Sequence, residues 1–301
     1  MRAVVIGNIA MDETLRVSHL PAPGETLLAR ASFAGAGGKG ANQAVTLARC
    51  GVPTRLLARL GNDAASVRAH ALLAAEGLDL STLTGTEAPI DRSIVLLTDA
   101  GENAIIATIV PAPPFTSAEL HAVVAGCGVG DLLVLQGNLT EAVTEAALRI
   151  GRARGMITVF NAAPASPGFA ALWALVDLAV LNSVEARQMT GLDDPEAAAR
   201  AIHAAGARQA VVTLGAAGAL LCDAGGAVRV AAEPVAVRDS TGAGDCFTAV
   251  LAAALYVCRV PPAAALSAAS RAAALAVGRI GALTSLPTAA ELAAILDDAA
   301  R

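Results

Sequence analysis

Aromatic side chains are scarce in this chain and make up only 2% of its 301 residues. Proteins that bind single-stranded nucleic acid stack bases on aromatic side chains and attract the phosphate backbone to a basic face. Neither feature is present, because the formal net charge is −5 and charged residues amount to only 16%. The composition therefore excludes nucleic acid as an expected partner and leaves small ligands open.

Long hydrophobic runs are also lacking. No apolar run reaches the roughly 18 residues that a membrane-spanning helix needs, and the longest candidate, residues 247–258, is typical of a buried helix. Residues 1–8, MRAVVIGN, are too short for a signal peptide and predict a first buried strand. We therefore expect no membrane association and a cytoplasmic location.

Paired cysteines and clustered histidines are missing as well. The five cysteines include no CxxC pair, and the four histidines are scattered along the chain. Disulfide frameworks and structural zinc sites depend on such spacing. The cysteines are therefore expected to be free thiols, and no metal site built from His and Cys is expected.

Hydrophobic residues, by contrast, make up 55% of the chain. Short continuous apolar runs predict strands that are buried on both faces of a sheet. Helical patterns separate these runs, and this alternation is typical of a doubly wound α/β fold. The expected strands are residues 3–7, 54–60, 131–136, 157–161, 178–182 and 210–214, and the helices between them are residues 41–50, 63–75, 117–126, 141–154 and 195–205. A hairpin over residues 219–222 and 227–230 and closing helices over residues 244–257, 262–277 and 288–300 complete the list.

Two regions interrupt this alternation. Residues 13–18 and 26–32 flank the turn PAPG, and residues 92–98 and 104–109 flank the turn DAGEN. Each segment alternates polar and apolar residues, which predicts a hairpin with one buried face. Together the hairpins predict a small sheet, separate from the main one, that would act as a lid and whose free face could pair with a second subunit.

The segment DSTGAGD, residues 239–245, directly precedes a long apolar helix. Glycines at a helix start leave backbone N–H groups without partners, and these groups form an anion site with the helix dipole. An acid inside that site would repel a bound phosphate. Its presence is explained if Asp245 takes a proton from a hydroxyl while the N–H groups hold the phosphoryl group in transfer. The segment therefore predicts phosphoryl transfer to an alcohol.

A second glycine-rich segment, GAGGKGANQA, covers residues 35–44. It contains the spacing GxGxxG, but it follows an amphipathic strand and is therefore a weak dinucleotide fingerprint. It is no P-loop either, because Gly40 stands where Ser or Thr would follow the lysine. A glycine loop lets a polyhydroxyl ligand approach the backbone closely, and Lys39 and Asn42 can donate to its hydroxyls. A turn with a solvated lysine is the simpler alternative.

These two segments, in this order, resemble the paired signatures of the PfkB carbohydrate kinases, and specifically those of the ribokinase branch. GGKGANQA, residues 37–44, is similar to the N-terminal signature, and DSTGAGDCF, residues 239–247, is similar to the C-terminal one. The resemblance covers nearly the full length of the chain. It implies an α/β fold, a ribokinase-like three-layer α/β/α sandwich with a small β-sheet lid. The expected single kinase domain spans residues 1–301, with the lid formed by about residues 10–34 and 90–110.

The resemblance also implies an activity. The chain is expected to be an ATP-dependent sugar kinase that transfers the γ-phosphoryl group to a primary hydroxyl of a ribose-like sugar. ATP, Mg²⁺ and an activating K⁺ would be the cofactors, and a homodimer through the lid is implied by analogy. Asp245 would be the catalytic base, and the backbone of residues 241–244, with Gly242, Ala243 and Gly244, would form the anion hole.

Binding roles follow from the same resemblance, residue by residue. The expected sugar-binding residues are Asp12, Gly38, Lys39, Asn42, Asn138 and Asp245. The expected nucleotide-binding residues are Asn182, Glu185, Thr213, Gly215 and Gly244. The expected monovalent-cation loop comprises Asp239, Thr241, Ala276, Arg279, Gly281 and Ser285, several of which would act through backbone carbonyls.

Ordinary structural roles remain open for several of these residues. Asn182 could simply cap a following helix, with Glu185 as its capping-box partner. Thr213 could be an ordinary strand residue, and Asp12 could belong to a turn at the end of a strand. Asp239 could satisfy the backbone of a loop.

Two positions depart from the ribokinase pattern. Ala10 stands two residues before Asp12, where ribokinases have Asn, and Asn138 stands where they have Glu. Each lost polar contact could remove roughly 1–3 kcal/mol of discrimination. The catalytic half of the pattern is intact, so we expect phosphoryl transfer, while the identity of the acceptor stays open. Another pentose, a deoxysugar or a nucleoside would suit a less polar pocket.

Three alternatives to a pentose kinase therefore remain. The first is a nucleoside kinase of the same family, and the second is a non-catalytic sugar-binding relative. The third is a nicotinamide oxidoreductase that uses the glycines of residues 35–40. A panel of sugars and nucleosides separates the first two from the main prediction, and a titration with the nicotinamide cofactor tests the third.

Overall fold

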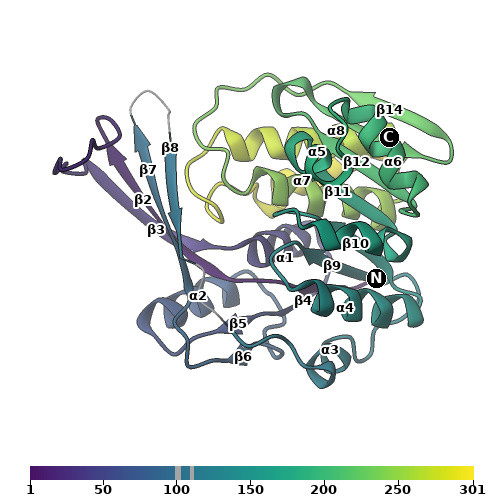
Figure 1. Ribbon diagram of the computed structural model, residues 1–301, viewed down its shortest axis with the longest axis horizontal. Helices are drawn as coiled ribbons and strands as arrows, with labels where there is room; N and C mark the ends of the chain where they lie inside the picture. Colours follow the sequence, from purple (N-terminus) through teal and green to yellow (C-terminus); the bar gives the residue numbers. More distant parts are fainter. Residues whose placement is uncertain (99–102, 109–111) are drawn as a thin grey trace.

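An eight-stranded sheet runs through the middle of the molecule in the computed structural model, which describes residues 1–98, 103–108 and 112–301 (Figure 1). The strand order is β14-β13-β12-β11-β10-β9-β1-β4, with parallel pairing from β12 to β4 and antiparallel pairing of β12, β13 and β14. The strands are β1 Ala3–Ile6, β4 Thr54–Leu57, β9 Leu132–Gln136, β10 Ile157–Asn161, β11 Leu178–Asn182, β12 Gln209–Thr213, β13 Ala219–Asp223 and β14 Gly226–Val230.

Helices cover both faces of this sheet, because its strands are apolar on both sides. In β9, Leu132 and Val134 pack into one hydrophobic cluster, whereas Leu133 and Leu135 pack into the other. The first cluster is covered by α1 Lys39–Arg49, α2 Ala64–Ala74, α7 Ala243–Ala252, α8 Pro262–Val277 and α9 Ala289–Ala299. The second is covered by α3 Ser117–Val123, α4 Glu141–Ala153, α5 Ser183–Thr190 and α6 Pro195–Ala204. The expected three-layer α/β/α sandwich is confirmed.

A second sheet of four strands projects away from the main one (Figure 1). Its order is β3-β2-β7-β8, in which β2 pairs with β3 antiparallel and with β7 parallel. The strands are β2 Ala10–Val17, β3 Ala31–Gly37, β7 Asp91–Thr98 and β8 Asn103–Ala107. The small separate sheet is therefore present, while its action as a lid and the proposed domain limits stay predictions.

One strand of this sheet differs from the expectation. The strand expected over residues 26–32 is wrong, because β3 begins only at Ala31 and continues to Gly37 through the glycine-rich segment. Gly37 fits there because it lacks a side chain: a Cβ atom at this position would lie 2.1 Å from Oδ2 of Asp12. In the other hairpin, residues 99–102 of the expected turn and residue 109 lie outside the described residues.

The strand expected over residues 54–60 is divided in two. β4 lies at the edge of the main sheet and ends at Leu57, after which β5, Arg59–Leu60, pairs with β6, Thr84–Gly85. The last helical turn of the expected helix 244–257 is π-helical, over Ala253–Val257. None of the helices in the described ranges is long and apolar enough to cross a membrane.

Candidate active site

A cleft of about 910 Å³ opens at the carboxyl ends of the parallel strands. This edge of an open α/β sheet is where ligands bind, since the strand ends and the loops after them converge there. The main sheet contributes residues at or just after the ends of its parallel strands, and the four-stranded sheet contributes Asp12 and Ser93. The strand-end residues include Asn8, Asn138, Asn161, Asn182 and Thr213.

Asp245 lies in the first turn of α7 and is only 4% exposed. Gly242 provides the N-cap of this helix with a φ of 78°, a left-handed conformation that glycine adopts without strain. Both carboxylate oxygens of Asp245 accept hydrogen bonds from α1: Asn42 Nδ2 donates to Oδ2 at 2.9 Å, and Gln43 Nε2 donates to Oδ1 at 2.9 Å. The carboxylate is therefore held in one orientation by side chains of the glycine-rich segment 35–44.

A row of buried amides extends behind this contact. Gln43 Nε2 also lies within hydrogen-bonding distance of Asn161 Oδ1, at 3.1 Å, and Gln43 Oε1 accepts from Gln136 Nε2 at 2.9 Å. No role was expected for the side chains of Gln43, Gln136 and Asn161 from their sequence context. A signal was available, because Gln136 and Asn161 are polar amide residues that end buried strands, at the edge where ligands bind.

The loop before α7 has two kinds of backbone N–H group. Thr241 N donates to Asp239 Oδ1 at 2.9 Å, and Ala243 N donates to the carbonyl of Ser240 at 3.3 Å. Within the described part of the chain, the N–H groups of Gly242 and Gly244 have no protein acceptor, and both residues line the cleft. An anion in the cleft can therefore be met by these two donors without breaking an existing bond.

All of the expected sugar-binding residues line the cleft. Burial raises the pKa of Asp12 above its usual value of 3.8, a hydrogen bond with Ser93 opposes this, and the charges of Asp239 and Asp245 raise it further. Gly38 has a φ of 93°, and a Cβ atom there would lie 2.9 Å from the Ala10 nitrogen. The cleft is lined by Asp12, Gly38, Lys39, Asn42, Asn138 and Asp245, and also by Ala10.

Asn182 and Glu185 form the helix cap that the sequence left open, and their expected role in nucleotide binding stays a prediction. Asn182 Oδ1 accepts from Glu185 N at 2.8 Å and Glu185 Oε2 accepts from Asn182 N at 2.8 Å, which is a capping box at the start of α5. Both residues also line the cleft, as does Thr213. Burial raises the pKa of Glu185, and the Asp245 charge adds to this, whereas the backbone of Asn182 and the Lys39 charge oppose it. Gly215 begins a 3₁₀ turn and does not line the cleft.

The expected cation loop lies next to residues 241–244 at the start of α7, which we call the anion loop. Asp239 is 4% exposed and bridges two chain segments, because Thr241 N and Gly281 N each donate to its carboxylate at 2.9 Å. Arg279 turns its guanidinium to Glu291, with a shortest distance of 2.6 Å, and Ser285 Oγ donates to the carbonyl of Ala282 at 2.8 Å. Among the described residues, no three His, Cys, Asp or Glu side chains gather as a metal site.

An α/β sandwich in which an acid meets unpaired N–H groups at a helix start defines a phosphotransferase that acts on a hydroxyl. Residues 2–289 match the pfkB family carbohydrate kinases. The chain belongs to this family.

Several proteins are similar to the chain over most of its length. It is 29% identical to a ribokinase of Haemophilus influenzae over 301 residues, which cover 98% of each protein. It is 30% identical to a deoxyribokinase of Salmonella typhimurium over 254 residues, covering 82% of this chain and 83% of that one. It is 28% identical over 298 residues to a bifunctional ribokinase/ribose-5-phosphate isomerase A of Fructilactobacillus sanfranciscensis. There the match covers 95% of this chain but only 54% of the relative.

Solved structures are similar over the whole fold. A ribokinase from Thermotoga maritima has a TM-score of 0.85 at 27% identity, with 98% of this chain and 99% of that chain covered. An Arabidopsis thaliana ribokinase complexed with ribose and ATP has a TM-score of 0.84 at 27% identity, with 98% of each chain covered. The protein is an ATP-dependent sugar kinase, a phosphotransferase with an alcohol group as acceptor.

Proposed function

We propose that the enzyme phosphorylates the primary hydroxyl of a ribose-like pentose, with Asp245 as the base. The observation that carries this proposal is the double hydrogen bond from Asn42 and Gln43, which holds the Asp245 carboxylate at the start of α7 inside the cleft. The carboxylate accepts the hydroxyl proton while the hydroxyl oxygen bonds to the γ-phosphorus. The bond from that phosphorus to the β–γ bridging oxygen breaks, and ADP leaves with the electron pair.

The negative charge that develops on the transferring group needs fixed donors. Gly242 and Gly244 supply two N–H groups that no described protein acceptor uses, at the positive end of α7. Thr241 and Ala243 instead hold the loop in shape, because their N–H groups donate to Asp239 and to Ser240. The proposed anion hole therefore consists of the N–H groups of Gly242 and Gly244 and does not use those of all four residues 241–244.

Mg²⁺ and K⁺ have separate proposed places. Mg²⁺ prefers few protein ligands and binds largely through substrate phosphates, which fits a cleft in which the carboxylate of Glu185 lies beside Asn182 at the start of α5. Asn182 and Glu185 would hold it through water, and it would neutralise phosphate charge. K⁺ would be held by Asp239 and by the backbone carbonyls of the expected cation loop, all of which are oxygen ligands. This ion would supply positive charge behind the anion loop.

The four-stranded sheet is proposed to act as the lid of the single kinase domain. Its residues Asp12 and Ser93 line the cleft together with residues of the main body, so a bound acceptor contacts both parts. Closure would exclude water, which otherwise competes with the acceptor for the phosphoryl group. A homodimer formed through this sheet and a cytoplasmic location remain predictions from the sequence.

A deoxypentose is the second candidate acceptor, and one specific feature favours it. Ala10 lines the cleft two residues before Asp12 and offers only a methyl group, so a hydroxyl facing it would lose its hydrogen bonds to water. The similarity to a deoxyribokinase over 82% of this chain is consistent with this choice.

The test is a panel of acceptors with ATP and Mg²⁺, run with and without K⁺. Ribose, 2-deoxyribose, fructose, adenosine and pseudouridine are compared by ADP release, and the product is examined by phosphorus NMR. We expect acceptor-dependent ADP release with phosphate on the primary carbon of a pentose, and faster turnover with K⁺. A preference for a nucleoside over every free sugar would replace the pentose assignment.

A further inference from the structure

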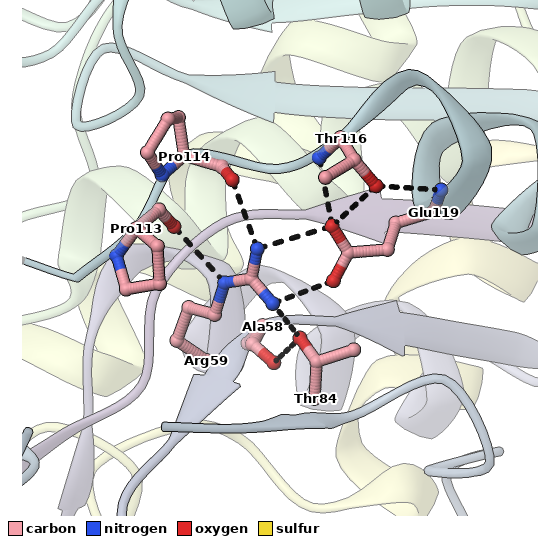
Figure 2. A network of polar contacts seen from close by, with 7 residues as sticks. All are labelled: Ala58, Arg59, Thr84, Pro113, Pro114, Thr116 and Glu119. Atoms are coloured by element: carbon pink, nitrogen blue, oxygen red, sulfur yellow. Dashed lines mark hydrogen bonds and ion pairs between the residues drawn. The ribbon is translucent and has the colours of Figure 1, made fainter. Parts of the chain in front are cut away.

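Arg59 uses the whole of its guanidinium in one polar network (Figure 2). Nε donates to the carbonyl of Pro113 at 3.1 Å, and Nη2 donates to that of Pro114 at 2.9 Å. Nη1 donates to Thr84 Oγ1 at 2.7 Å, and both Nη atoms contact the carboxylate of Glu119, at 2.5 and 3.1 Å. Arginine has five N–H donors, so these contacts occupy all of them.

The same guanidinium also stacks on an aromatic ring. The central carbon of Arg59 lies 4.5 Å from the centroid of Phe115, and the Arg59 side chain is only 14% exposed. A cation over a ring face is attracted by it, and more strongly when water is excluded. Arg59 therefore fixes three consecutive residues, Pro113, Pro114 and Phe115, through two carbonyls and one ring.

The residues that Arg59 fixes form part of the cleft wall. Pro113, Pro114, Phe115 and Arg59 itself line the cleft, together with Ile90. Arg59 lies in β5, which follows β4, and β4 is at one end of the series of parallel strands in the main sheet. Thr213, one of the expected nucleotide-binding residues, ends β12 at the other end of that series. The wall held by Arg59 therefore belongs to the acceptor end of the cleft.

Arg59 also joins the two chain connections of the β7–β8 hairpin, one of the two hairpins of the four-stranded sheet. Thr84 lies in β6, shortly before the chain enters that sheet at β7. Pro113 and Pro114 lie after β8 and before α3, where the chain has returned to the main body. Glu119 completes the link, because it accepts from Thr116 N at 2.7 Å in the capping box of α3 and from Arg59.

We propose that Arg59 is a positioning residue for the acceptor: it sets the place of the apolar wall formed by Pro113, Pro114 and Phe115. The proposal rests on the proposed function, because it assumes that the acceptor binds at this end of the cleft. A lysine cannot replace the arginine, since a single ammonium group does not reproduce the planar five-donor contact. The wall would then lose its fixed distance from Asp12 and Lys39.

The test compares Arg59→Lys and Arg59→Gln with the matched variant Arg55→Lys. Arg55 also holds backbone carbonyls, those of Val123 and Ala125 at 2.9 and 3.1 Å, and pairs with Asp79 at 2.7 Å. It does not line the cleft. We expect both Arg59 variants to raise the acceptor KM about tenfold while the ATP KM changes by less than about twofold.

Amide hydrogen exchange gives a readout that does not depend on turnover. We expect faster exchange over residues 115–119 in the Arg59 variants and wild-type exchange there in Arg55→Lys. Wild-type acceptor KM and exchange in folded Arg59→Lys would overturn the proposal. So would equal rises in the acceptor and ATP KM, which indicate a general structural role. If the wild-type enzyme phosphorylates no pentose, the proposed function fails instead, and that result is seen before any variant is made.

Discussion

Gln43 Nε2 lies 2.9 Å from Oδ1 of Asp245, although the two residues are 202 positions apart in the chain. Gln43 belongs to α1 and Asp245 to α7, so this one contact joins the two glycine-rich segments that the sequence marks separately. A carboxylate that accepts a proton in a defined direction must be held in that direction, and Gln43 holds it. The amide is itself fixed by Gln136.

The first prediction concerns this contact. Gln43→Leu keeps the approximate size of the side chain but removes the donor, so we expect kcat to fall by about 10- to 100-fold with a smaller change in the ATP KM. Thr46→Val is the matched control, because Thr46 is also buried in α1 but donates to the carbonyl of Asn42 instead. A folded Gln43→Leu enzyme with wild-type kcat would contradict the positioning role.

The fold was largely predictable because its strands are buried on both faces. Alternate residues such as Leu132 and Leu133 reach opposite hydrophobic clusters, so each strand reads as a continuous apolar run. β3 was misplaced because glycines normally predict a loop, whereas here residues 31–37 pair with β2. Glycine is needed at position 37 of this strand because the Asp12 carboxylate occupies the space that a side chain would take.

The site was only partly predictable. Glycine-rich segments ahead of helices mark backbone donors, which pointed to Asp245 and to the loop before it. The contacts of Gln43 with Asp245 and with Asn161 depend on how α1 packs beside α7 and β10, and no local spacing encodes that packing. The same holds for Arg59, whose partners lie up to 60 positions away.

A second prediction tests the acceptor. Ala10→Asn places an amide in the cleft beside Asp12, and we expect it to raise kcat/KM for ribose relative to 2-deoxyribose by about fivefold, the value of one hydrogen bond. Ala31→Asn, in β3 and outside the cleft, should leave this ratio unchanged. An unchanged ratio in Ala10→Asn would show that the position does not face the discriminating hydroxyl.

A third prediction separates stability from binding at Asp12. Burial raises the pKa of this carboxyl above 3.8, so its charge costs folding free energy at neutral pH. Asp12→Asn removes the charge, and we expect a higher melting temperature at neutral pH together with an acceptor KM raised about 10- to 100-fold. Thermal unfolding and steady-state kinetics measure the two effects. A lower melting temperature with an unchanged acceptor KM would show that the Asp12 charge neither costs folding free energy nor contributes to acceptor binding.

A fourth prediction concerns pH and the Arg59 network. Burial raises the pKa of Glu119, but hydrogen bonds from Arg59 and Thr116 outweigh it and lower the pKa from 4.5 to about 2. A depressed pKa in the folded state stabilises the fold above pH 4.5, and this stability is lost as the pH falls from there towards about 2. Urea unfolding at about pH 6 and about pH 3 measures the loss. Glu119→Gln should show a smaller decrease than the wild type, and an equal decrease would exclude Glu119 as a contributor.

The most direct test of the account is the rate of acceptor-dependent ADP release by Asp245→Asn. The new amide keeps one oxygen as an acceptor, and the Asn42 amide, whose Oδ1 has no partner among the described residues, can rotate to accept from the new NH₂ group, so the variant should fold with nearly wild-type stability. An amide cannot accept the hydroxyl proton, and we expect turnover to fall about a thousandfold while ATP still binds. A folded Asp245→Asn enzyme that releases ADP at close to the wild-type rate would contradict the assignment of Asp245 as the base.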